Sequence, residues 1–223
     1  LQYDDVTDEE IDMTFLKDYR VKVFDNPNEL KEQIIRCNNI KNKSRILAGY
    51  CWDWISKEDP QGDKYDIEIP EYDFKMKWNF NKTIWAIDKD SIGQAGCIHT
   101  SQGLEFDYVG VIIGKDLRYE NGKIITDFKE RASTDKSLSG IKKMYKENPE
   151  GALKLADEII KNTYRTLLTR GQNGCYIYCK DKALSEYLKN RLTTAKEIIY
   201  PVDAENQYTE LKVAEDSEEY KYE

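Results

Sequence analysis

Three short apolar runs constrain the fold of this chain more than any other feature. They are SRILAGYC at residues 44–51, YVGVII at residues 108–113 and CYIYC at residues 175–179. None of them alternates regularly between polar and apolar residues. That pattern is typical of a strand covered on both faces, as in a parallel sheet, rather than of a strand with one face in water. The sequence therefore predicts a buried, mostly parallel sheet.

Helical patterns separate these runs and fit that arrangement. The first follows a short strand at residues 21–24 and has a cap at Asp25 or Asn26, the second runs from Pro149 to Leu168, and the third is capped by Asp181. Strands that alternate with helices are typical of layered α/β domains. The predicted fold class is therefore α/β.

Two connecting segments carry signals of their own. Asn121-Gly122 lies between alternating flanks, which is a strong signal for a β-hairpin with a two-residue turn. Residues 60–95 are rich in Asp, Lys and aromatic residues, and the stretch DIEIPEYDFKMKWN alternates in part. We expect an extended excursion or an irregular hairpin in that second region.

Charge is unevenly distributed along the 223 residues. The net charge is −8, but residues 1–10 carry five acidic residues and no basic one, and residues 203–223 carry eight acidic residues and two lysines. The part between them has a net charge of +3, so the acidic total does not exclude a nucleic-acid partner. We expect residues 1–20 to be an acidic linker or N-terminal helix from a missing preceding domain, residues 21–200 to form one domain, and residues 201–223 to be an acidic tail.

Cysteine and histidine usage argues against disulfides and zinc. The five cysteines are odd in number, form no C-x-x-C pair and mostly have apolar neighbours, which favours reduced thiols in a cytoplasmic protein. Cys175 and Cys179 would lie about 13 Å apart on one strand, too far to share a metal. No apolar run is long enough to cross a bilayer. Because the chain opens at Leu1 without a signal-peptide pattern, we expect it to be cut from a longer cytoplasmic protein with no metal site and no membrane partner.

Polar residues beside the buried strands mark where a site is expected. In open α/β sheets, ligands bind beyond the carboxyl ends of the strands. Three segments qualify on this ground: CWDW at residues 51–54, IHTSQGLEF at residues 98–106 and YRTLLTRGQNG at residues 164–174. GVIIGKD, at residues 110–116, is not a P-loop, because three residues rather than four separate its glycines and Asp116 replaces the magnesium-binding Ser or Thr. This chain alone is not expected to hydrolyse a nucleotide.

Two of the three segments resemble helicase motifs. IHTSQGLEFDYVGVIIG is similar to motif V of superfamily-one helicases, and NTYRTLLTRGQNGCYIYC is similar to their motif VI. With RILAGYCWDW in the position of motif IV and the segment DFKMKWN, the sequence most resembles the Schlafen group-3-like DNA/RNA helicase domain, over about residues 20–195. The resemblance implies that residues 21–200 form a RecA-like fold with an inserted β-hairpin. It also implies a missing N-terminal RecA-like domain that carries the P-loop.

The resemblance assigns catalytic roles to two arginines. Arg170 would be an arginine finger: a guanidinium at a helix end that faces a nucleotide on another domain stabilises the charge that develops in phosphoryl transfer, an effect of roughly 10³ to 10⁵ in rate. Arg165, five positions earlier, would make a second phosphate contact or, alternatively, a salt bridge to a surface acid. ATP with Mg²⁺ is the implied cofactor, bound mainly by the missing domain.

Residues in the motif V-like turn are the implied cofactor contacts of this chain. Gly103 lets a ligand approach the backbone closely, and Glu105 accepts hydrogen bonds from a ribose hydroxyl. The alternative for both is an ordinary turn with an exposed glutamate. Gln102 stands where many of these helicases carry Lys, so one positive contact is absent here.

Nucleic-acid contacts are implied for the residues just before this turn. His99, Thr100 and Ser101 correspond to positions that touch the nucleic-acid backbone, a contact that carries no sequence information. A satisfied structural role is the alternative for His99, which is the one histidine of the chain.

Three tryptophans and one arginine belong to the motif IV-like and DFKMKWN segments. Trp52, Trp54 and Trp78 are candidates to stack on single-stranded bases, worth roughly 1 to 3 kcal/mol per base, or to pack at the sheet edge. Arg45 precedes its strand, whereas the wider superfamily has an arginine after it. A phosphate contact from motif IV is therefore not assigned.

Together these features predict the C-terminal RecA-like half of an ATP-dependent helicase or translocase. It would grip single-stranded DNA or RNA and supply Arg170 to an ATP held by the missing lobe, whose closure couples hydrolysis to movement. The alternative is a non-catalytic adaptor with a helicase-like fold, favoured by the acidic balance, the absent P-loop and Gln102. A free-standing nuclease or hydrolase would need a carboxylate or nucleophile cluster that the sequence does not display.

Overall fold

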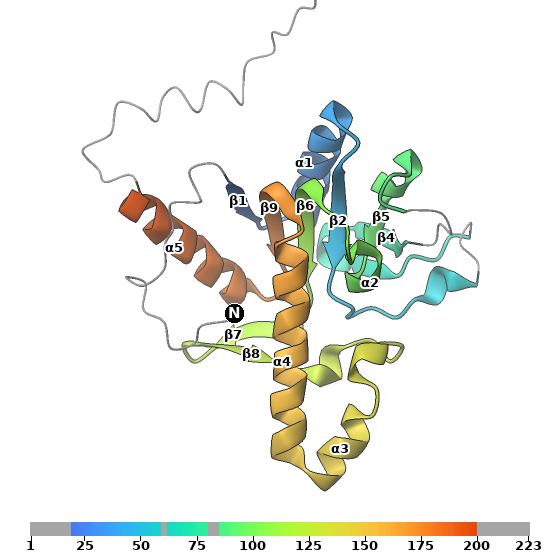
Figure 1. The fold of residues 1–223 in the computed structure, drawn as a ribbon, viewed down its shortest axis with the longest axis vertical. Helices are drawn as coiled ribbons and strands as arrows, with labels where there is room; N and C mark the ends of the chain where they lie inside the picture. The colour runs from blue at the N-terminus through green and yellow to red at the C-terminus, as the bar shows by residue number, and fades with distance from the viewer. Residues whose placement is uncertain (1–18, 59–61, 80–84, 200–223) are drawn as a thin grey trace, which may run out of the picture.

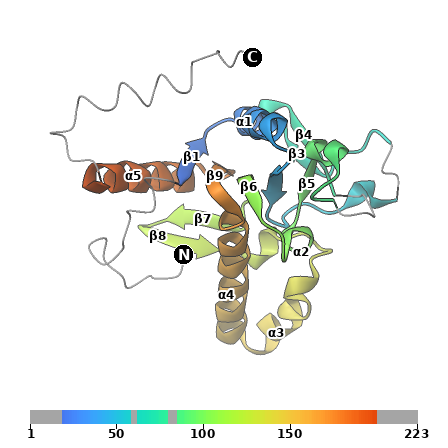
Figure 2. The ribbon, with the colours of Figure 1, turned by 45° about the horizontal axis from the view of Figure 1, so that its top comes forward.

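A central sheet organises the protein, whose computed structural model describes residues 19–58, 62–79 and 85–199. Its strands are β1 (Arg20–Phe24), β2 (Ser44–Ala48), β3 (Ile67–Ile69), β4 (Phe74–Trp78), β5 (Gln94–Gly96), β6 (Phe106–Ile113) and β9 (Gly171–Cys179). They form one seven-stranded sheet in the order β1-β9-β6-β2-β5-β4-β3 (Figures 1 and 2). All neighbours are parallel except β3 and β4. The predicted α/β class with a mostly parallel sheet is confirmed.

The described ranges contain five α-helices, which are α1 (Pro27–Ile40), α2 (Ile98–Ser101), α3 (Ile141–Glu147), α4 (Pro149–Leu168) and α5 (Lys182–Ile199). Of these five, α1, α4 and α5 begin where the sequence pattern predicts a helix, whereas α2 and α3 were not predicted. The side chains of Asn26, Asn148 and Asp181 accept hydrogen bonds from backbone N–H groups in the first turns of α1, α4 and α5 at 2.9, 3.0 and 2.7 Å. No helix in the described ranges combines the length and the apolar character that a membrane span requires.

The sheet is buried on both faces, as the unbroken apolar runs predict. Alternate residues of the central strands point to opposite sides. Leu47 and Val111 pack with α4 and α5 in one core, whereas Ile46 and Ile112 pack with α1 in the other. Every residue of β2 is buried, because helices or hairpins cover both of its faces. The layered arrangement of helices about the sheet is consistent with a RecA-like fold.

The two predicted connecting segments both form hairpins. β7 (Leu117–Glu120) and β8 (Lys123–Thr126) pair as a separate two-stranded sheet, and Asn121 and Gly122 have φ angles of 51° and 80°, as a tight two-residue turn requires. Within residues 60–95, β3 and β4 form the second hairpin. β4 also pairs with β5, so this hairpin extends the central sheet instead of lying apart from it. Its buried apolar residues complete the core that α1 begins.

Cysteines add no covalent link to this fold. All five are free thiols, and Cys175 and Cys179 are buried in the core beneath α4 and α5. Burial raises the pKa of both thiols. In the described part of the chain, no cluster of three or more His, Cys, Asp or Glu residues is arranged to hold a metal ion. Residues 1–18 of the expected linker and residues 201–223 of the expected tail lie outside the described ranges.

Candidate functional site

The motif V-like segment forms α2 and an open turn that leads into β6. Gly103 has a φ of 74°, in the left-handed region, and no atom lies within 4 Å of the position that a Cβ would occupy there. Gln102 and Glu105, on either side, are exposed. The three residues that the resemblance assigns to cofactor contact therefore lie on an open surface at the start of β6.

The motif VI-like segment forms the end of α4 and the turn into β9. Arg165 is exposed, and within the described ranges it forms no ion pair with an acidic residue. Arg170 is half-buried. Its Nε donates to the carbonyl oxygen of Thr166 at 3.2 Å, and its Nη1 lies 3.5 Å from the carbonyl oxygen of Leu104, at the long limit of a hydrogen bond. Among the described residues, no carboxylate neutralises this guanidinium.

These two turns meet, although they are far apart in the sequence. Phe106 and Gly171 are register partners in β6 and β9, and the Phe106 N–H donates to the Arg170 carbonyl oxygen at 2.9 Å. Gln172 Nε2 donates to Glu105 Oε2 at 2.6 Å. We call this surface, at the upper end of α4 in Figure 1, the amino-edge site; it consists of Gln102, Gly103, Glu105, Arg170 and Gln172. Gln172 was not among the candidates from the sequence, although it stands two residues after Arg170.

The amino-edge site lies at a different end of the sheet from the expected one. The rule for open α/β sheets places ligands at the carboxyl ends of strands. Here the polar turns precede β6 and β9, and the parallel pairing of those strands brings the turns together at the amino ends. Of the three candidate segments, only residues 51–54 follow the carboxyl end of a long central strand, β2. The predicted residues thus divide between two ends of the sheet.

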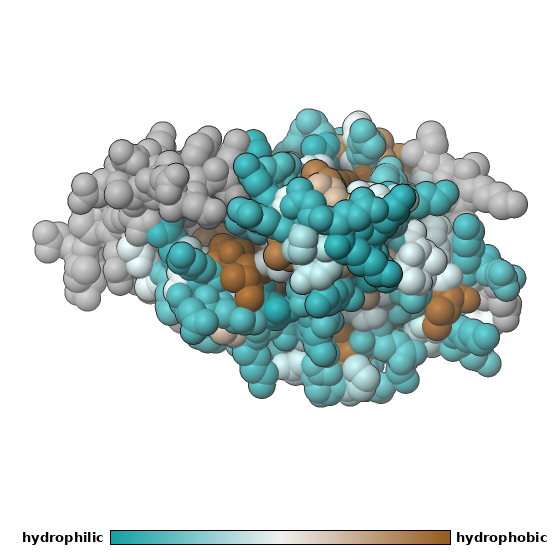
Figure 3. Space-filling model, turned by 90° about the horizontal axis from the view of Figure 1, so that it is seen from below, coloured by the Kyte–Doolittle hydropathy of each residue, from teal (hydrophilic) through white to brown (hydrophobic). Residues whose placement is uncertain are grey.

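A cavity of about 840 Å³ occupies the other end of the sheet, between the chain that follows β2 and the segment at residues 131–142, which consists of a loop and the start of α3. Its lining includes the basic and aromatic side chains of Tyr50, Trp54, Lys57, His99, Lys136 and Lys142. Asp135 is the one carboxylate among the described lining residues, and the guanidinium of Arg131 neutralises it at 2.6 Å. The surface viewed from below in Figure 3 is mostly hydrophilic, with hydrophobic side chains in small, separate patches. A basic cavity with aromatic walls suits an anionic ligand that carries flat rings.

The predicted nucleic-acid contacts differ in how accessible they are. His99 is exposed and lines the cavity. The Thr100 hydroxyl accepts from the Cys97 N–H at 2.9 Å and lies 3.0 Å from the Cys97 carbonyl oxygen, so it stabilises the start of α2. Ser101 is buried, and its hydroxyl donates to the carbonyl oxygen of Ile98 at 3.2 Å. Of the three side chains, the imidazole is the one that faces solvent.

The tryptophans divide in the same way. Trp78 is fully buried and stacks on Tyr50 with 5.1 Å between ring centroids, so its predicted role in packing is confirmed. Its indole N–H donates to the Trp52 carbonyl oxygen at 3.1 Å. Trp52 and Trp54 are half-buried, and Lys57 lies over the Trp54 ring at 5.8 Å. Trp54 lines the cavity, whereas Trp52 does not.

Arg45 has a structural role. It is fully buried in β2, and burial lowers the pKa of its guanidinium. The charge of Asp88 offsets part of this decrease. Its nitrogen atoms donate to Ser91 Oγ, Asn38 Oδ1 and Asn42 Oδ1 at 2.7 to 2.8 Å. The guanidinium is used within the fold, so no phosphate contact comes from the motif IV-like position.

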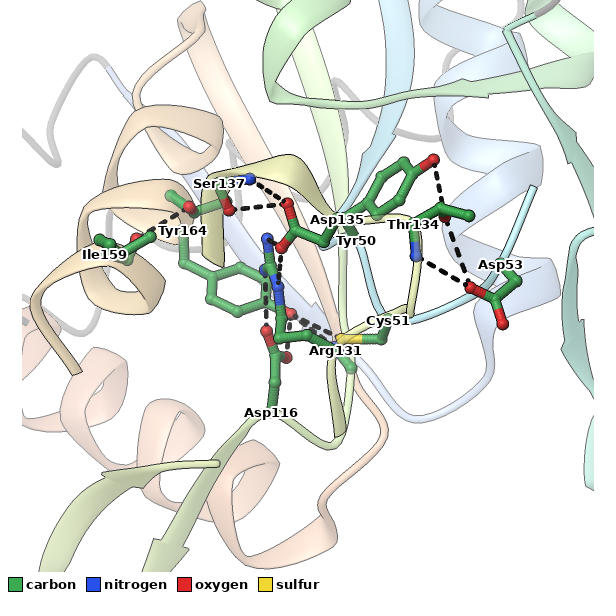
Figure 4. A network of polar contacts seen from close by, with 12 residues as sticks. Tyr50, Cys51, Asp53, Asp116, Arg131, Thr134, Asp135, Ser137, Ile159 and Tyr164 are labelled. Atoms are coloured by element: carbon green, nitrogen blue, oxygen red, sulfur yellow. Dashed lines mark hydrogen bonds and ion pairs between the residues drawn. The ribbon is translucent and has the colours of Figure 1, made fainter. Parts of the chain in front are cut away.

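A second buried arginine, Arg131, belongs to the lining of the cavity and joins a network of polar contacts (Figure 4). Arg131 Nη1 lies 3.0 Å from Asp116 Oδ2, and its Nε donates to Asp135 Oδ2 at 2.8 Å. Asp116 accepts a short hydrogen bond from the Tyr164 hydroxyl. Burial lowers the pKa of Arg131, but the carboxylates of Asp116 and Asp135 raise it by a larger amount. The net shift of the pKa is therefore upward. We call Asp116, Arg131, Asp135 and Tyr164 the buried network.

Comparison with known proteins gives a family and one relative. The family model "Schlafen group 3, DNA/RNA helicase domain" matches residues 1–181. The uncharacterized protein YPL245W of Saccharomyces cerevisiae is 29% identical over 177 residues, which are 78% of this chain and 37% of that protein. The chain therefore spans less than two fifths of the length of this relative. No solved structure matches the chain.

Proposed function

This chain belongs to the Schlafen group 3 DNA/RNA helicase domain family, and from that premise we propose that it is the second RecA-like half of an ATP-dependent superfamily-one helicase or translocase. Its partner would be an N-terminal RecA-like lobe with a P-loop. The family supports a helicase-related function, and the layered sheet is consistent with a RecA-like domain.

The amino-edge site supports a role in nucleotide hydrolysis. One observation carries this proposal: among the described residues, the Arg170 guanidinium has two backbone carbonyl oxygens and no carboxylate as partners, and it lies beside the open turn at Gly103. A cation that is held in place but not neutralised is available to a phosphate. Glu105, oriented by Gln172, would accept a hydrogen bond from a ribose hydroxyl. ATP with Mg²⁺ on the other lobe would supply the phosphoryl group.

The cavity supports a role in binding single-stranded nucleic acid. Lys57, Lys136 and Lys142 would neutralise phosphates, and Trp54 offers a ring on which a base can stack. His99 would add a contact to the backbone from α2. Because phosphate contacts carry no sequence information, we expect binding to depend on salt and little on sequence.

The test is ATP hydrolysis by the full-length protein that contains this chain, with and without single-stranded DNA or RNA. Arg170→Ala should lower nucleic-acid-stimulated turnover by about 10³-fold or more, while oligonucleotide binding persists. Arg36→Ala is a matched control, because Arg36 is an exposed arginine on α1 whose partner is Glu32 at 3.7 Å. That control should hydrolyse ATP as the wild type does.

Two results would contradict the proposal. Unchanged turnover in Arg170→Ala would refute the arginine-finger role. A full-length protein that binds nucleic acid or a protein partner but does not hydrolyse ATP would favour the non-catalytic adaptor, which the glutamine at position 102 also favours.

A further inference from the structure

The buried network joins the wall of the cavity to α4, the helix that precedes Arg170. Arg131 begins the loop at residues 131–140, which leads into α3, and forms an ion pair with Asp116. Asp116 in turn accepts from the hydroxyl of Tyr164, which belongs to α4. The exposed fractions of the Asp116 and Arg131 side chains are 0% and 2%. Figure 4 shows these side chains converging from the loop, from the chain after β6 and from α4.

The Tyr164 ring is fully buried and closely packed. A Cβ on Gly49 would lie 2.0 Å from the Tyr164 hydroxyl oxygen, so the end of β2 approaches the phenol as closely as a glycine allows. The same hydroxyl accepts from the Gly114 N–H at 2.9 Å. A Cβ on Gly114 would lie 2.3 Å from Cys51 Sγ. In a close-packed interior, a shift of α4 against the carboxyl ends of β2 and β6 would have to break these contacts.

The helix that carries Tyr164 also leads directly to Arg170 of the amino-edge site. Tyr164 directly precedes Arg165, and α4 continues to Leu168 before the chain turns at Arg170. The Thr169 N–H donates to the Arg165 carbonyl oxygen at 3.2 Å, and the Arg170 N–H donates to that of Leu167 at 3.3 Å, so the turn is hydrogen-bonded to the helix. A displacement at Tyr164 is therefore passed on to Arg170 by a regular, hydrogen-bonded segment.

We propose that Tyr164 and Asp116 are positioning residues that make the cavity wall and the end of α4 move as one body. Single-stranded nucleic acid in the cavity would thereby fix the orientation of Arg170 and stimulate hydrolysis. This inference rests on the proposed function and deepens it, because it assigns the regulation of the nucleotide site to particular side chains. Tyr164 and Asp116 line neither the cavity nor the amino-edge site, so their effect would be separable from ligand contact.

The first test compares Tyr164→Phe with the wild type in the full-length protein. Removing the hydroxyl should reduce the stimulation of ATP hydrolysis by a single-stranded oligonucleotide to little or none, while the unstimulated rate and the oligonucleotide affinity stay unchanged. Tyr145→Phe is the matched control. Tyr145 is a half-buried tyrosine on α3 that packs on Phe128 with 5.4 Å between centroids, and its hydroxyl has no hydrogen bond among the described residues. This variant should be stimulated as the wild type is.

A second measurement follows the conformation of the protein rather than its ATP hydrolysis. Hydrogen exchange of the amides at residues 165–172 should slow when an oligonucleotide binds the wild-type protein. The slowing should disappear in Tyr164→Phe, and the Lys136→Ala, Lys142→Ala double variant should lose oligonucleotide affinity.

Two outcomes would overturn the inference. They are full stimulation in Tyr164→Phe, and unchanged exchange at residues 165–172 when an oligonucleotide is bound to the wild type. Failure of the proposed function would look different, because Arg170→Ala would then retain turnover or no oligonucleotide would bind.

Discussion

Arg131 and Arg170 occupy opposite ends of the sheet and have opposite environments. The Arg131 side chain is 2% exposed and faces the carboxylates of Asp116 and Asp135. Arg170 is half-buried, and its partners are two backbone carbonyl oxygens. An arginine that is buried and neutralised has no capacity left for a ligand, whereas one held by neutral acceptors keeps its charge available. Whether the partners of an arginine are carboxylates or neutral carbonyl oxygens therefore indicates whether its charge is available to a ligand.

The largest expected difference between these two arginines is in stability. Arg131→Ala would leave two buried carboxylates without their cation, and breaking such a pair costs about 3 to 5 kcal/mol. Arg170→Ala should change the free energy of unfolding by less than about 1 kcal/mol, because no buried charge loses its partner. Urea unfolding of both variants measures the difference. Equal losses in the two variants would show that the two arginines do not differ in their contribution to stability.

The next effect is a loss of stability at alkaline pH. Burial and the Asp116 carboxylate raise the pKa of the Tyr164 hydroxyl well above its usual value. Because the folded state holds this proton more tightly than the unfolded state, the stabilisation is complete below the unfolded pKa of about 10 and is lost as pH rises above it. The loss is up to about 1.4 kcal/mol per pH unit for each such group.

Unfolding measured from pH 9 to 11 should therefore show a steeper decline in the wild type than in Tyr164→Phe. Other buried tyrosines contribute to both curves equally, so the difference between the slopes isolates this hydroxyl. Identical slopes would mean that Tyr164 ionises in the folded protein as readily as in water. The buried network would then be accessible to solvent.

The smallest effect is expected at the exposed pair of the amino-edge site. Gln172→Ala removes the donor that orients Glu105, and it should change stability by no more than about 0.5 kcal/mol, as a surface substitution does. ATP affinity of the full-length protein should fall less than about tenfold, the value of one net hydrogen bond. Calorimetric titration with ATP measures this change. A large loss of stability instead would place Gln172 with the buried network rather than with the ligand site.

Local patterns predicted most of the elements and one of the two sites. The unbroken apolar runs predicted β2, β6 and β9, and Asn121-Gly122 predicted the β7–β8 turn, because burial on both faces and a positive φ each impose a residue type on the chain. The motif-like turns around Gly103 and Arg170 predicted candidates that the structure brings to one surface. The extension of the sheet by β4 was not predicted, since its partner β5 is short and carries little pattern of its own.

The mostly parallel α/β sheet, the helix caps, the tight hairpin and the two polar turns each depend on residues close together in the chain, so local patterns specify them. The meeting of those turns at the amino ends of β6 and β9 depends on how the chain folds. Folding also brings Lys57, Lys136 and Lys142 to one cavity and places Asp116 between Arg131 and Tyr164. Strand pairing and the neutralisation of buried charge join residues at long separations in sequence, and such partners leave no local pattern.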